Sequence, residues 1–334
     1  MLSQVKQMLR DKLPKFAVGL SPMDDITTME YRNICKSYGA DVLFTEFVSS
    51  DALIRDVEKS YQKIAFKEEE RPVGIQIFGA NEQSLVEAAQ RVEELDSDFI
   101  DINWGCPMKK IATKGAGSGI LQDIDKMIKI TRAVVKSVKK PVTVKTRIAY
   151  DNNSAKITDF CEALQDCGIQ LLSIHGRTKQ QMYNGSADWT LIGEVKNNQR
   201  MTIPIFGNGD IDSAEKMLEY KNRYGVDGIL IGRGSIGKPY IFKQCHQILE
   251  QQDISPTDRR LYEPTTREKA IICKQHFTSL LENRQERNAI IIMKKFYSKY
   301  FSSITNFKPF KMKLINADNK EEILLLLDEI ANME

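Results

Sequence analysis

The chain has 334 residues, a formal net charge of +3, 42% hydrophobic residues and 28% charged residues. This composition is that of a folded globular protein, and it excludes both a disordered chain and nucleic-acid binding through overall charge alone. The length exceeds that of most single compact domains but fits a barrel of roughly 250 residues with a small appended domain.

Cysteine and histidine usage limits the possible sites. Six cysteines show no CxxC pairing and only three histidines are present. This argues against a structural zinc site or a disulfide framework, so we expect no metal and a reducing, cytoplasmic location. Residues 1–15 carry charges throughout, and the chain lacks an apolar run of about 18 residues, so we expect neither a signal peptide nor a membrane partner.

One pattern repeats from Phe16 to about Gly237: a short apolar run, a polar or glycine-containing turn, then a helical periodicity. The predicted strands are Phe16–Leu20, Val42–Val48, Val73–Phe78, Phe99–Asn103, Val142–Ile148, Leu171–His175, Ile203–Phe206 and Gly228–Ile231. Amphipathic segments at 81–95, 123–138 and 154–167 begin with Asn, Asp or Ser, which can cap a helix. Eight such units predict a (β/α)8 TIM barrel; the rival open sheet should show a GxGxxG turn after its first strand, and none follows the first strand here.

A polar, Pro-containing linker covers residues 251–266, and only helical periodicities follow it. We therefore predict two domains, a catalytic barrel over residues 1–250 and a small all-helical domain over residues 251–334.

Polar or glycine-containing sequences stand at or near the carboxyl end of every predicted strand. They are Ser21 to Asp24, Glu46, Gln76, Asn103 with Cys106, Lys145 with Arg147, His175 with Arg177, Asn208 to Asp210, and Gly232 to Gly234. In a barrel these strand ends meet at one mouth. Because an unpaired buried polar atom costs about 1–3 kcal/mol, this density indicates a functional site.

Individual residues at these ends suggest roles. Cys106 ends the turn Asp101-Ile-Asn-Trp-Gly-Cys-Pro107, where a thiol would face the mouth, although a buried structural cysteine is the alternative. The loops at Asn208–Asp210 and Gly232–Gly234 predict a phosphate site, unless their glycines only make tight turns.

Lys145 lies in an apolar strand, so it faces an anion such as a reduced flavin or forms a salt bridge to Glu46 or Asp101. We expect His175, beside Arg177, to contact an anion. Gln76 either hydrogen-bonds the edge of a heterocycle or caps the next helix.

These motifs together resemble the tRNA-dihydrouridine synthase family, most of all its bacterial branch, from about Leu20 to Arg233. The resemblance rests on Ser-Pro-Met (21–23), Thr-Glu (45–46), Gln-Ile-Phe-Gly (76–79), the 101–107 turn, Lys-Gly-Ala-Gly-Ser-Gly (114–119), Lys-Thr-Arg (145–147), His-Gly-Arg-Thr (175–178), Gly-Asn-Gly-Asp (207–210) and Gly-Arg-Gly (232–234). Their joint order and spacing are specific.

The resemblance implies a barrel that holds FMN, with NADPH or NADH as reductant, and a helical domain that binds tRNA. It implies that the flavin is held by Pro22, Met23, Asp24, Gln76, Lys145 and His175, and its phosphate by Asn208, Gly209, Asp210, Gly232 and Arg233. Hydride would pass from the flavin to C6 of a uridine, and Cys106 would protonate C5. We also expect Asn103, Arg147 and Arg177 to position the substrate.

Between Arg284 and Lys313 the chain has eight basic residues against one acid, with aromatic residues interleaved. The helical spacing predicts that most of these aromatics are core and that the cations form an outer face. We expect Arg287, Lys294, Lys295 and Lys299 to contact tRNA.

The chain departs from the family pattern at Asp24-Asp25, where Ala-Gly is common, at Ala149, where glycine is common, and at Phe296, where histidine is expected.

The rival functions are a barrel flavoenzyme acting on a free dihydropyrimidine or dihydroorotate, a phosphate-binding isomerase, and an inactive tRNA-binding module. We expect a monomer without a protein partner.

Overall fold

Nine parallel strands form the centre of the computed structural model, which describes residues 9–305 and 307–333. The strands are β1 (Ala17–Leu20), β2 (Leu43–Phe44), β3 (Val48–Ser49), β4 (Val73–Phe78), β5 (Phe99–Trp104), β6 (Val142–Arg147), β7 (Leu172–His175), β8 (Ile205–Asn208) and β9 (Gly228–Ile231). The sheet runs in the order β1-β9-β8-β7-β6-β5-β4-β2, and β3 pairs with β4. The two ends of this order, β1 and β2, are joined by main-chain bonds: the Leu20 N–H donates to the Val42 carbonyl and the Asp41 N–H to the Val18 carbonyl, just before β2, which closes the barrel.

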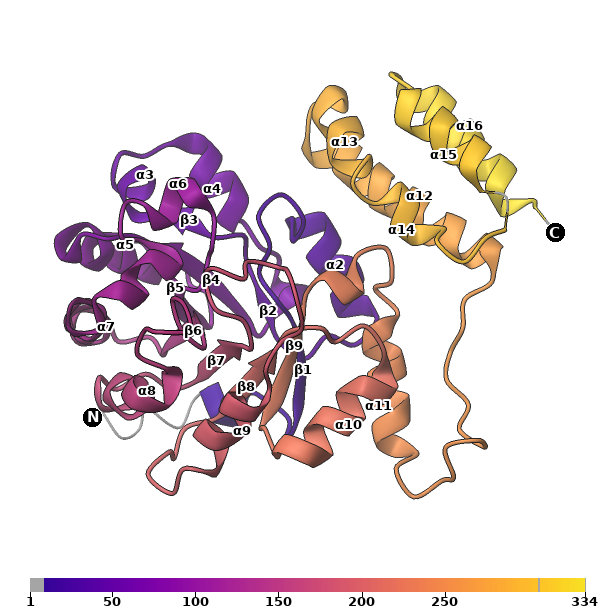
Figure 1. The fold of residues 1–334 in the computed structure, drawn as a ribbon. Coiled ribbons are helices and arrows are strands. Elements are labelled where there is room, and N and C mark those ends of the chain that lie inside the picture. Colours follow the sequence, from indigo (N-terminus) through magenta and orange to yellow (C-terminus); the bar gives the residue numbers. More distant parts are fainter. Residues whose placement is uncertain (1–8, 306, 334) are drawn as a thin grey trace.

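Helices cover the outside of this sheet (Figure 1). They are α2 (Met29–Ser37), α3 (Ser50–Ile54), α4 (Glu58–Ile64), α5 (Glu82–Glu94), α6 (Lys109–Ala112), α7 (Ile124–Ser137), α8 (Ile157–Asp166), α9 (Thr190–Asn197), α10 (Ala214–Tyr224) and α11 (Ile241–Glu250), with short 3₁₀ turns η1 (Glu68–Glu70), η2 (Gly117–Gln122) and η3 (Arg233–Ser235). This arrangement confirms the predicted (β/α)8 barrel.

Most predicted strands are observed within two residues of their expected bounds, but the second is not continuous. The single strand expected over Val42–Val48 is split into β2 and β3. The Thr45 hydroxyl accepts the main-chain N–H of Gln76 at 3.2 Å, so a side chain replaces a main-chain partner of the ladder there. The helix expected from residue 154 begins at Ile157, because Ser154 donates to Asp151 and the N–H of Lys156 donates to Asp159.

The barrel interior changes from apolar to polar along its axis. Phe44, Phe99 and Phe206 fill the end at which the strands begin, together with Leu171, while Leu230 of the same cluster reaches the cavity at the other end. Side chains two and four residues further along the strands point to the same interior, since strand side chains alternate. The alternation therefore places Asp101 and then Asn103 above Phe99, and it directs polar groups to the mouth.

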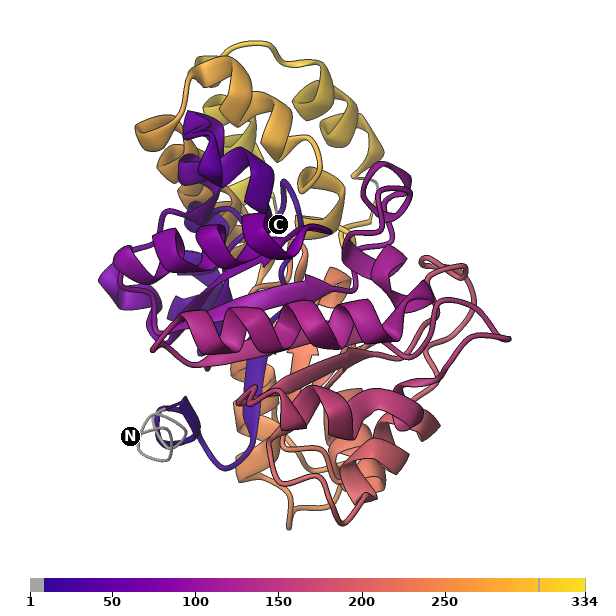
Figure 2. The same ribbon diagram turned by 90° about the vertical axis from the view of Figure 1, so that its left-hand side faces the viewer.

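A helical region follows an extended linker after Glu250 (Figures 1 and 2). Its helices are α12 (Thr266–Asn283), α13 (Glu286–Met293), α14 (Tyr297–Tyr300), α15 (Lys308–Asn316) and α16 (Lys320–Ala331). The domain boundary near residue 250 stays a prediction, and residues 1–8, 306 and 334 of the two predicted domains lie outside the described residues.

The helical region packs against the barrel through α12 and α2. The Tyr31 ring of α2 lies 4.9 Å from the Phe296 ring and 5.2 Å from the His276 ring, measured between centroids. Arg284 also pairs with Glu30 of α2 at 3.2 Å. Phe296, which stands where the resemblance led us to expect histidine, is thus a buried apolar contact between the two regions. Within the described part of the chain, no helix has the length and apolarity needed to cross a membrane.

Candidate functional site

A cavity of about 810 Å³ opens at the carboxyl ends of the barrel strands. Sixteen of the nineteen sequence-predicted site residues line it: Pro22, Met23, Asp24, Gln76, Asn103, Cys106, Lys145, Arg147, His175, Arg177, Asn208, Gly209, Asp210, Gly232, Arg233 and Lys299. The other three, Arg287, Lys294 and Lys295, lie outside it on the helical region. A second cavity of about 800 Å³ lies at the opposite end of the barrel, beside Phe206 and Lys221.

The turn that carries Cys106 is held from several sides. Asn103 lies on the inward face of β5, just before this turn. Its Oδ1 accepts the N–H groups of Gly105 at 2.9 Å and Cys106 at 2.8 Å. The Ser118 hydroxyl donates to the Cys106 carbonyl at 2.8 Å, and Arg147 Nε donates to the Gly105 carbonyl at 2.8 Å. The sulfur-bearing residue is 6% exposed and lines the cavity, so it is accessible only from the mouth.

The Cys106 thiol is protonated at neutral pH. Burial raises its pKa, and this outweighs the nearby charges of Arg147 and Lys145, which lower it. A protonated thiol can act as a general acid, whereas a nucleophilic cysteine needs a lowered pKa.

Gln76 lies beside this turn on the inward face of β4. Its Oε1 accepts from Asn103 Nδ2 at 2.8 Å and its Nε2 donates to Asp101 at 2.6 Å. Helix α5 is capped instead by Asn81, which accepts the Ser84 N–H at 3.0 Å. The capping alternative for Gln76 is therefore wrong, and its amide belongs to the cavity wall.

Lys145 is a buried cation without a carboxylate partner among the described residues. Its Nζ donates to Asn208 Oδ1 at 3.2 Å, and the salt bridges considered for it, to Glu46 or Asp101, are not formed. Burial, helped by the charge of Arg147, lowers the pKa of Lys145 to about 8, so the ammonium persists at pH 7. An unpaired buried cation of this kind indicates an anionic ligand in the cavity.

Arg147 is also buried, and it joins two loops of the mouth. Besides Gly105, its guanidinium donates to the carbonyls of Thr178 and Met182, each at 2.9 Å. Its charge also lies 5.8 Å from the centre of the Tyr183 ring, and Arg233 lies 5.0 Å from the same ring.

Sequence reasoning missed Tyr183, which lines the cavity between these two cations. The signal available was that it is the only aromatic residue in the polar segment 176–188.

The strand ends of β7 and β8 form a second cluster of charge. Arg177 binds the Asp210 carboxylate at 2.8 Å, and Arg233 approaches that carboxylate at 3.5 Å. Burial and the charges of Arg147 and Lys145 hold the pKa of His175 well below its usual range, so this imidazole is neutral. Gly209 has φ +126° and a Cβ there would lie 2.7 Å from the Ala187 Cβ, so only glycine fits this close approach.

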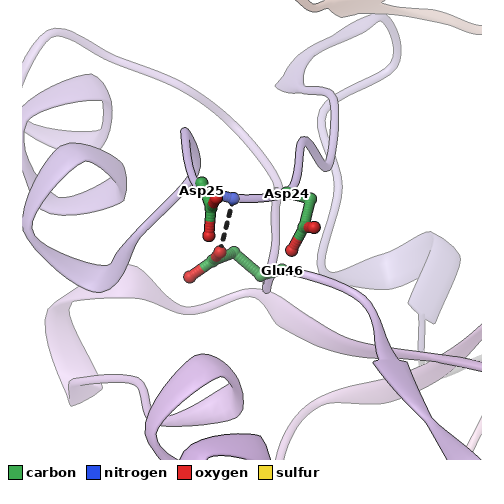
Figure 3. A group of neighbouring side chains, drawn as sticks. All are labelled: Asp24, Asp25 and Glu46. Atoms are coloured by element: carbon green, nitrogen blue, oxygen red, sulfur yellow. Dashed lines mark hydrogen bonds between the residues drawn. The ribbon is translucent and has the colours of Figure 1, made fainter. Parts of the chain in front are cut away.

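Three carboxylates gather beside the mouth: Asp24, Asp25 and Glu46 (Figure 3). The Asp25 N–H donates to Glu46 at 2.7 Å. The ammonium of Lys63 contacts all three side chains, binding Asp24 closely and lying 3.4 Å from Asp25 and 3.6 Å from Glu46. Since the Lys63 ammonium already contacts all three carboxyl groups, we assign no metal to them.

Asp25 explains one departure from the family pattern. Its φ is +54°, the left-handed region that glycine adopts freely, which accounts for the glycine common there. The Asp25 carboxylate also binds Lys295 of the helical region at 3.2 Å, so Lys295 is an ion-pair partner of the barrel.

Replacing Asp25 should separate these two effects. Asp25→Gly removes the backbone strain together with the ion pairs, whereas Asp25→Ala removes the ion pairs alone. Exposed ion pairs contribute about 0–1 kcal/mol, and strain of this kind costs roughly 1 kcal/mol, so the two effects nearly cancel in the glycine variant. Urea denaturation should show the alanine variant about 1 kcal/mol less stable than the glycine variant. Equal stabilities would contradict the strain argument; Asp24→Ala, at ordinary φ, is the control.

The helical region presents further cations. Arg287, Lys299, Lys308 and Lys313 are exposed, and Lys294 is half-buried. Phe296, Tyr297, Tyr300, Phe301 and Phe307 are buried, which confirms that most of the interleaved aromatics are core.

The architecture is thus a parallel barrel with a protonated thiol and unpaired cations at its mouth, a class that includes many oxidoreductases. Comparison with known proteins narrows this class. The family model described as Dihydrouridine synthase (Dus) matches residues 19–333, and the chain belongs to this family. A tRNA-dihydrouridine synthase B of Pasteurella multocida is 35% identical over 322 residues, covering 96% of this chain and 94% of that protein. The tRNA-dihydrouridine synthase B of Vibrio vulnificus is 40% identical, over 71% of this chain and 73% of its own.

Solved structures of similar fold are more distant. Histamine dehydrogenase from Rhizobium sp. 4-9 aligns with a TM-score of 0.55 at 15% identity, over 82% of this chain and 51% of that one. A 2-naphthoyl-CoA reductase aligns with a TM-score of 0.53 at 11% identity, over 68% of this chain and 49% of that one. These similarities support the fold alone.

Proposed function

We propose that the protein is a tRNA-dihydrouridine synthase that reduces the C5–C6 double bond of specific uridines with FMN and NADPH or NADH. The observation that carries the proposal is the pairing, in one cavity, of a protonated thiol at Cys106 with the unpaired buried ammonium of Lys145. Family membership supports the same function, and we place the reaction in the cytoplasm, with tRNA as the partner.

The residues of the cavity fit FMN. A reduced flavin ring and a phosphate are both anionic. Among the residues that line the cavity, the cations outnumber the carboxylates: Lys145, Arg147, Arg177, Lys216, Arg233 and Lys299 against Asp24, Asp25, Asp210 and Asp212. Lys63 binds Asp24 and Asp25, and Arg177 binds Asp210. Gln76, Lys145 and His175, with Pro22, Met23 and Asp24, would hold the ring and ribityl chain. Asn208, Gly209, Asp210, Gly232 and Arg233 would hold the phosphate. The Asp210 carboxylate contributes by orienting Arg177 and Arg233, since a carboxylate itself repels phosphate.

FMN, when bound, would supply a hydride donor that a nicotinamide nucleotide can reduce again after each turnover. The chain supplies the proton and the alignment. The Cys106 thiol donates its proton to C5 of the uracil, and Asn103, Arg147 and Arg177 position the base or its phosphate. Lys145 would supply a positive charge to a bound flavin and so stabilise the anionic reduced ring.

The substrate uridine must leave its stack to enter the barrel mouth, at a cost of a few kcal/mol. Cations outside the cavity offset this cost by binding phosphates. Arg287, Lys294 and Lys299 are suited to this role, with Lys299 at the cavity rim. Lys295 would have to exchange its Asp25 carboxylate for a phosphate.

The direct test is the oxidation of the reduced protein by candidate substrates. FMN-loaded protein is reduced with NADPH without oxygen and mixed with unmodified tRNA, free uracil or orotate, and flavin absorbance is followed. We expect rapid reoxidation by tRNA alone. Reoxidation by a free pyrimidine and not by tRNA would favour a small-molecule oxidoreductase, and a protein that binds no flavin would exclude every redox function.

Removing cations from the helical region should weaken tRNA binding in a salt-dependent way. Each cation that no longer binds a phosphate reduces the slope of log K against log salt by about 0.7–0.9, so the Arg287→Ala, Lys294→Ala, Lys299→Ala variant should have a slope smaller by about 2. Filter binding at several salt concentrations measures it. Lys221→Ala, at the opposite end of the barrel, is the control. A slope equal to that of the native protein would show that these cations do not bind phosphates.

FMN binding should weaken above about pH 8. The pKa of Lys145 is lowered to about 8, so its ammonium is present below this pH and disappears as the pH rises through it. Titration of FMN into flavin-free protein should therefore show the dissociation constant rising above pH 8. In Lys145→Arg, whose guanidinium stays charged, this rise should disappear. A pH dependence that the arginine variant shares would assign it to another group.

A further inference from the structure

Asp101 is a buried carboxylate inside the barrel that does not line the cavity. It lies on β5, two residues before Asn103, and is fully buried. One carboxylate oxygen accepts from Gln76 Nε2 at 2.6 Å, and the other accepts the Thr143 hydroxyl of β6. Burial raises the pKa of Asp101 to about 6, which leaves it ionised at neutral pH.

A continuous chain of hydrogen bonds leads from this carboxylate to the reactive turn. Gln76 donates to Asp101 and accepts from Asn103 at 2.8 Å. Asn103 in turn accepts the N–H groups of Gly105 and Cys106. We call Asp101, Gln76 and Asn103 the Asp101 chain.

The two ends of the Asp101 chain dictate its direction. A carboxylate can only accept, and a main-chain N–H can only donate. Gln76 must therefore turn its NH₂ group toward Asp101 and its oxygen toward Asn103, and Asn103 must turn its oxygen toward the turn. Hydrogen bonds to an ionised acceptor are about twice as strong as neutral ones, so the carboxylate holds this orientation firmly.

We propose that Asp101 is a positioning residue for the reaction: through the amides of Gln76 and Asn103 it holds the Cys106 turn in place and selects the amide atoms that face the cavity. This role rests on the proposed function, because Gln76 faces the flavin and Asn103 faces the uridine only if that function holds. Asp101 itself contacts neither.

A merely structural role for Asp101 would make a different prediction. If Asp101 only stabilises the barrel, replacing it changes the reactivity of Cys106 equally whether or not Gln76 can link Asp101 to the Cys106 turn. A positioning residue affects Cys106 only while the Gln76 amide is present. The double-mutant cycle of Asp101→Asn and Gln76→Leu separates these cases, since in this scheme the link from residue 101 to residue 106 must pass through the Gln76 amide.

The experiment measures the alkylation rate of Cys106 in FMN-loaded protein. Native protein, Asp101→Asn, Gln76→Leu and the double variant are treated with iodoacetamide, and each cysteine is followed by peptide mass spectrometry. Cys167, also 6% exposed, is the internal reference. Asp101→Asn preserves size but can present either oxygen or NH₂ to Gln76, so it no longer dictates the direction.

We expect Asp101→Asn to speed Cys106 alkylation about 3- to 10-fold with Cys167 unchanged, and to lower kcat by a similar factor with KM for tRNA unchanged. In the Gln76→Leu background the same substitution should change neither rate. An unchanged Cys106 rate in Asp101→Asn would overturn the proposal, as would an equal acceleration in the Gln76→Leu background. Thr143→Val, which removes the other bond to the carboxylate, provides a second variant and should act in the same direction more weakly.

The outcome is separable from the proposed function. If the native protein forms no dihydrouridine, the proposed function fails, and with it the claim on turnover. The alkylation cycle still decides whether Asp101 holds the Cys106 turn, because that measurement needs no tRNA.

Discussion

Replacing Cys106 with alanine should lower the rate of dihydrouridine formation by about 10²–10⁴-fold, the usual contribution of a general acid. The thiol lines the cavity and its pKa is raised, which is why we propose it as the proton donor. FMN should remain bound, since the residues proposed to hold the flavin are unchanged. Mass spectrometry of nucleosides from treated tRNA measures the rate.

Cys167→Ala is the matched control for this substitution. Cys167 has the same exposure as Cys106 but lies at the end of α8, away from the cavity. It should retain native turnover. If Cys106→Ala kept native turnover as well, a different group would have to protonate C5.

Replacing Arg147 with lysine should lower kcat/KM at least tenfold although the charge is kept. The guanidinium bonds three carbonyls, those of Gly105, Thr178 and Met182, and one ammonium cannot reach all of them in these directions. Each buried carbonyl left unpaired costs about 1–3 kcal/mol, so the free energy of unfolding should also fall. Steady-state kinetics and urea denaturation measure the two effects.

Lys179→Met, in the same loop, is the control because, among the described residues, the Lys179 ammonium interacts with the Tyr150 side chain and with no carbonyl of the mouth. It should change neither quantity appreciably. An Arg147→Lys protein with native activity and stability would show that charge alone, and not the three carbonyl bonds, accounts for Arg147.

The sequence predicted the barrel and the position of its mouth because both follow from local patterns. Apolar runs of strand length and their following polar residues are read directly, and parallel strands bring those residues to one end. Cys106, Lys145 and Asn208 therefore line one cavity, as expected.

What sequence could not predict depends on side-chain contacts across the fold. The bond between Gln76 and Asp101 joins different strands, and the ion pair between Asp25 and Lys295 joins the barrel to the helical region. Strand and helix periodicities carry no information about such pairs. Tyr183 was missed because a lone aromatic residue in a polar loop has no periodicity to place it.

Positive φ at Asp25 also escaped sequence reasoning. Aspartate can adopt this backbone conformation, but an aspartate in a sequence does not indicate positive φ. The glycine that the resemblance led us to expect would have indicated it. The departure from the family pattern was visible, but its consequence depends on the position of Lys63 and Lys295 in space.

The central claim is that the mouth residues act together on a uridine of tRNA, and one measurement tests it most directly. Unmodified tRNA is incubated without oxygen with FMN-loaded protein and NADPH, digested to nucleosides and analysed by mass spectrometry. We expect dihydrouridine, two hydrogens heavier than uridine, at specific positions in the tRNA. Folded, flavin-loaded protein that oxidises NADPH but leaves every uridine unchanged would contradict the account.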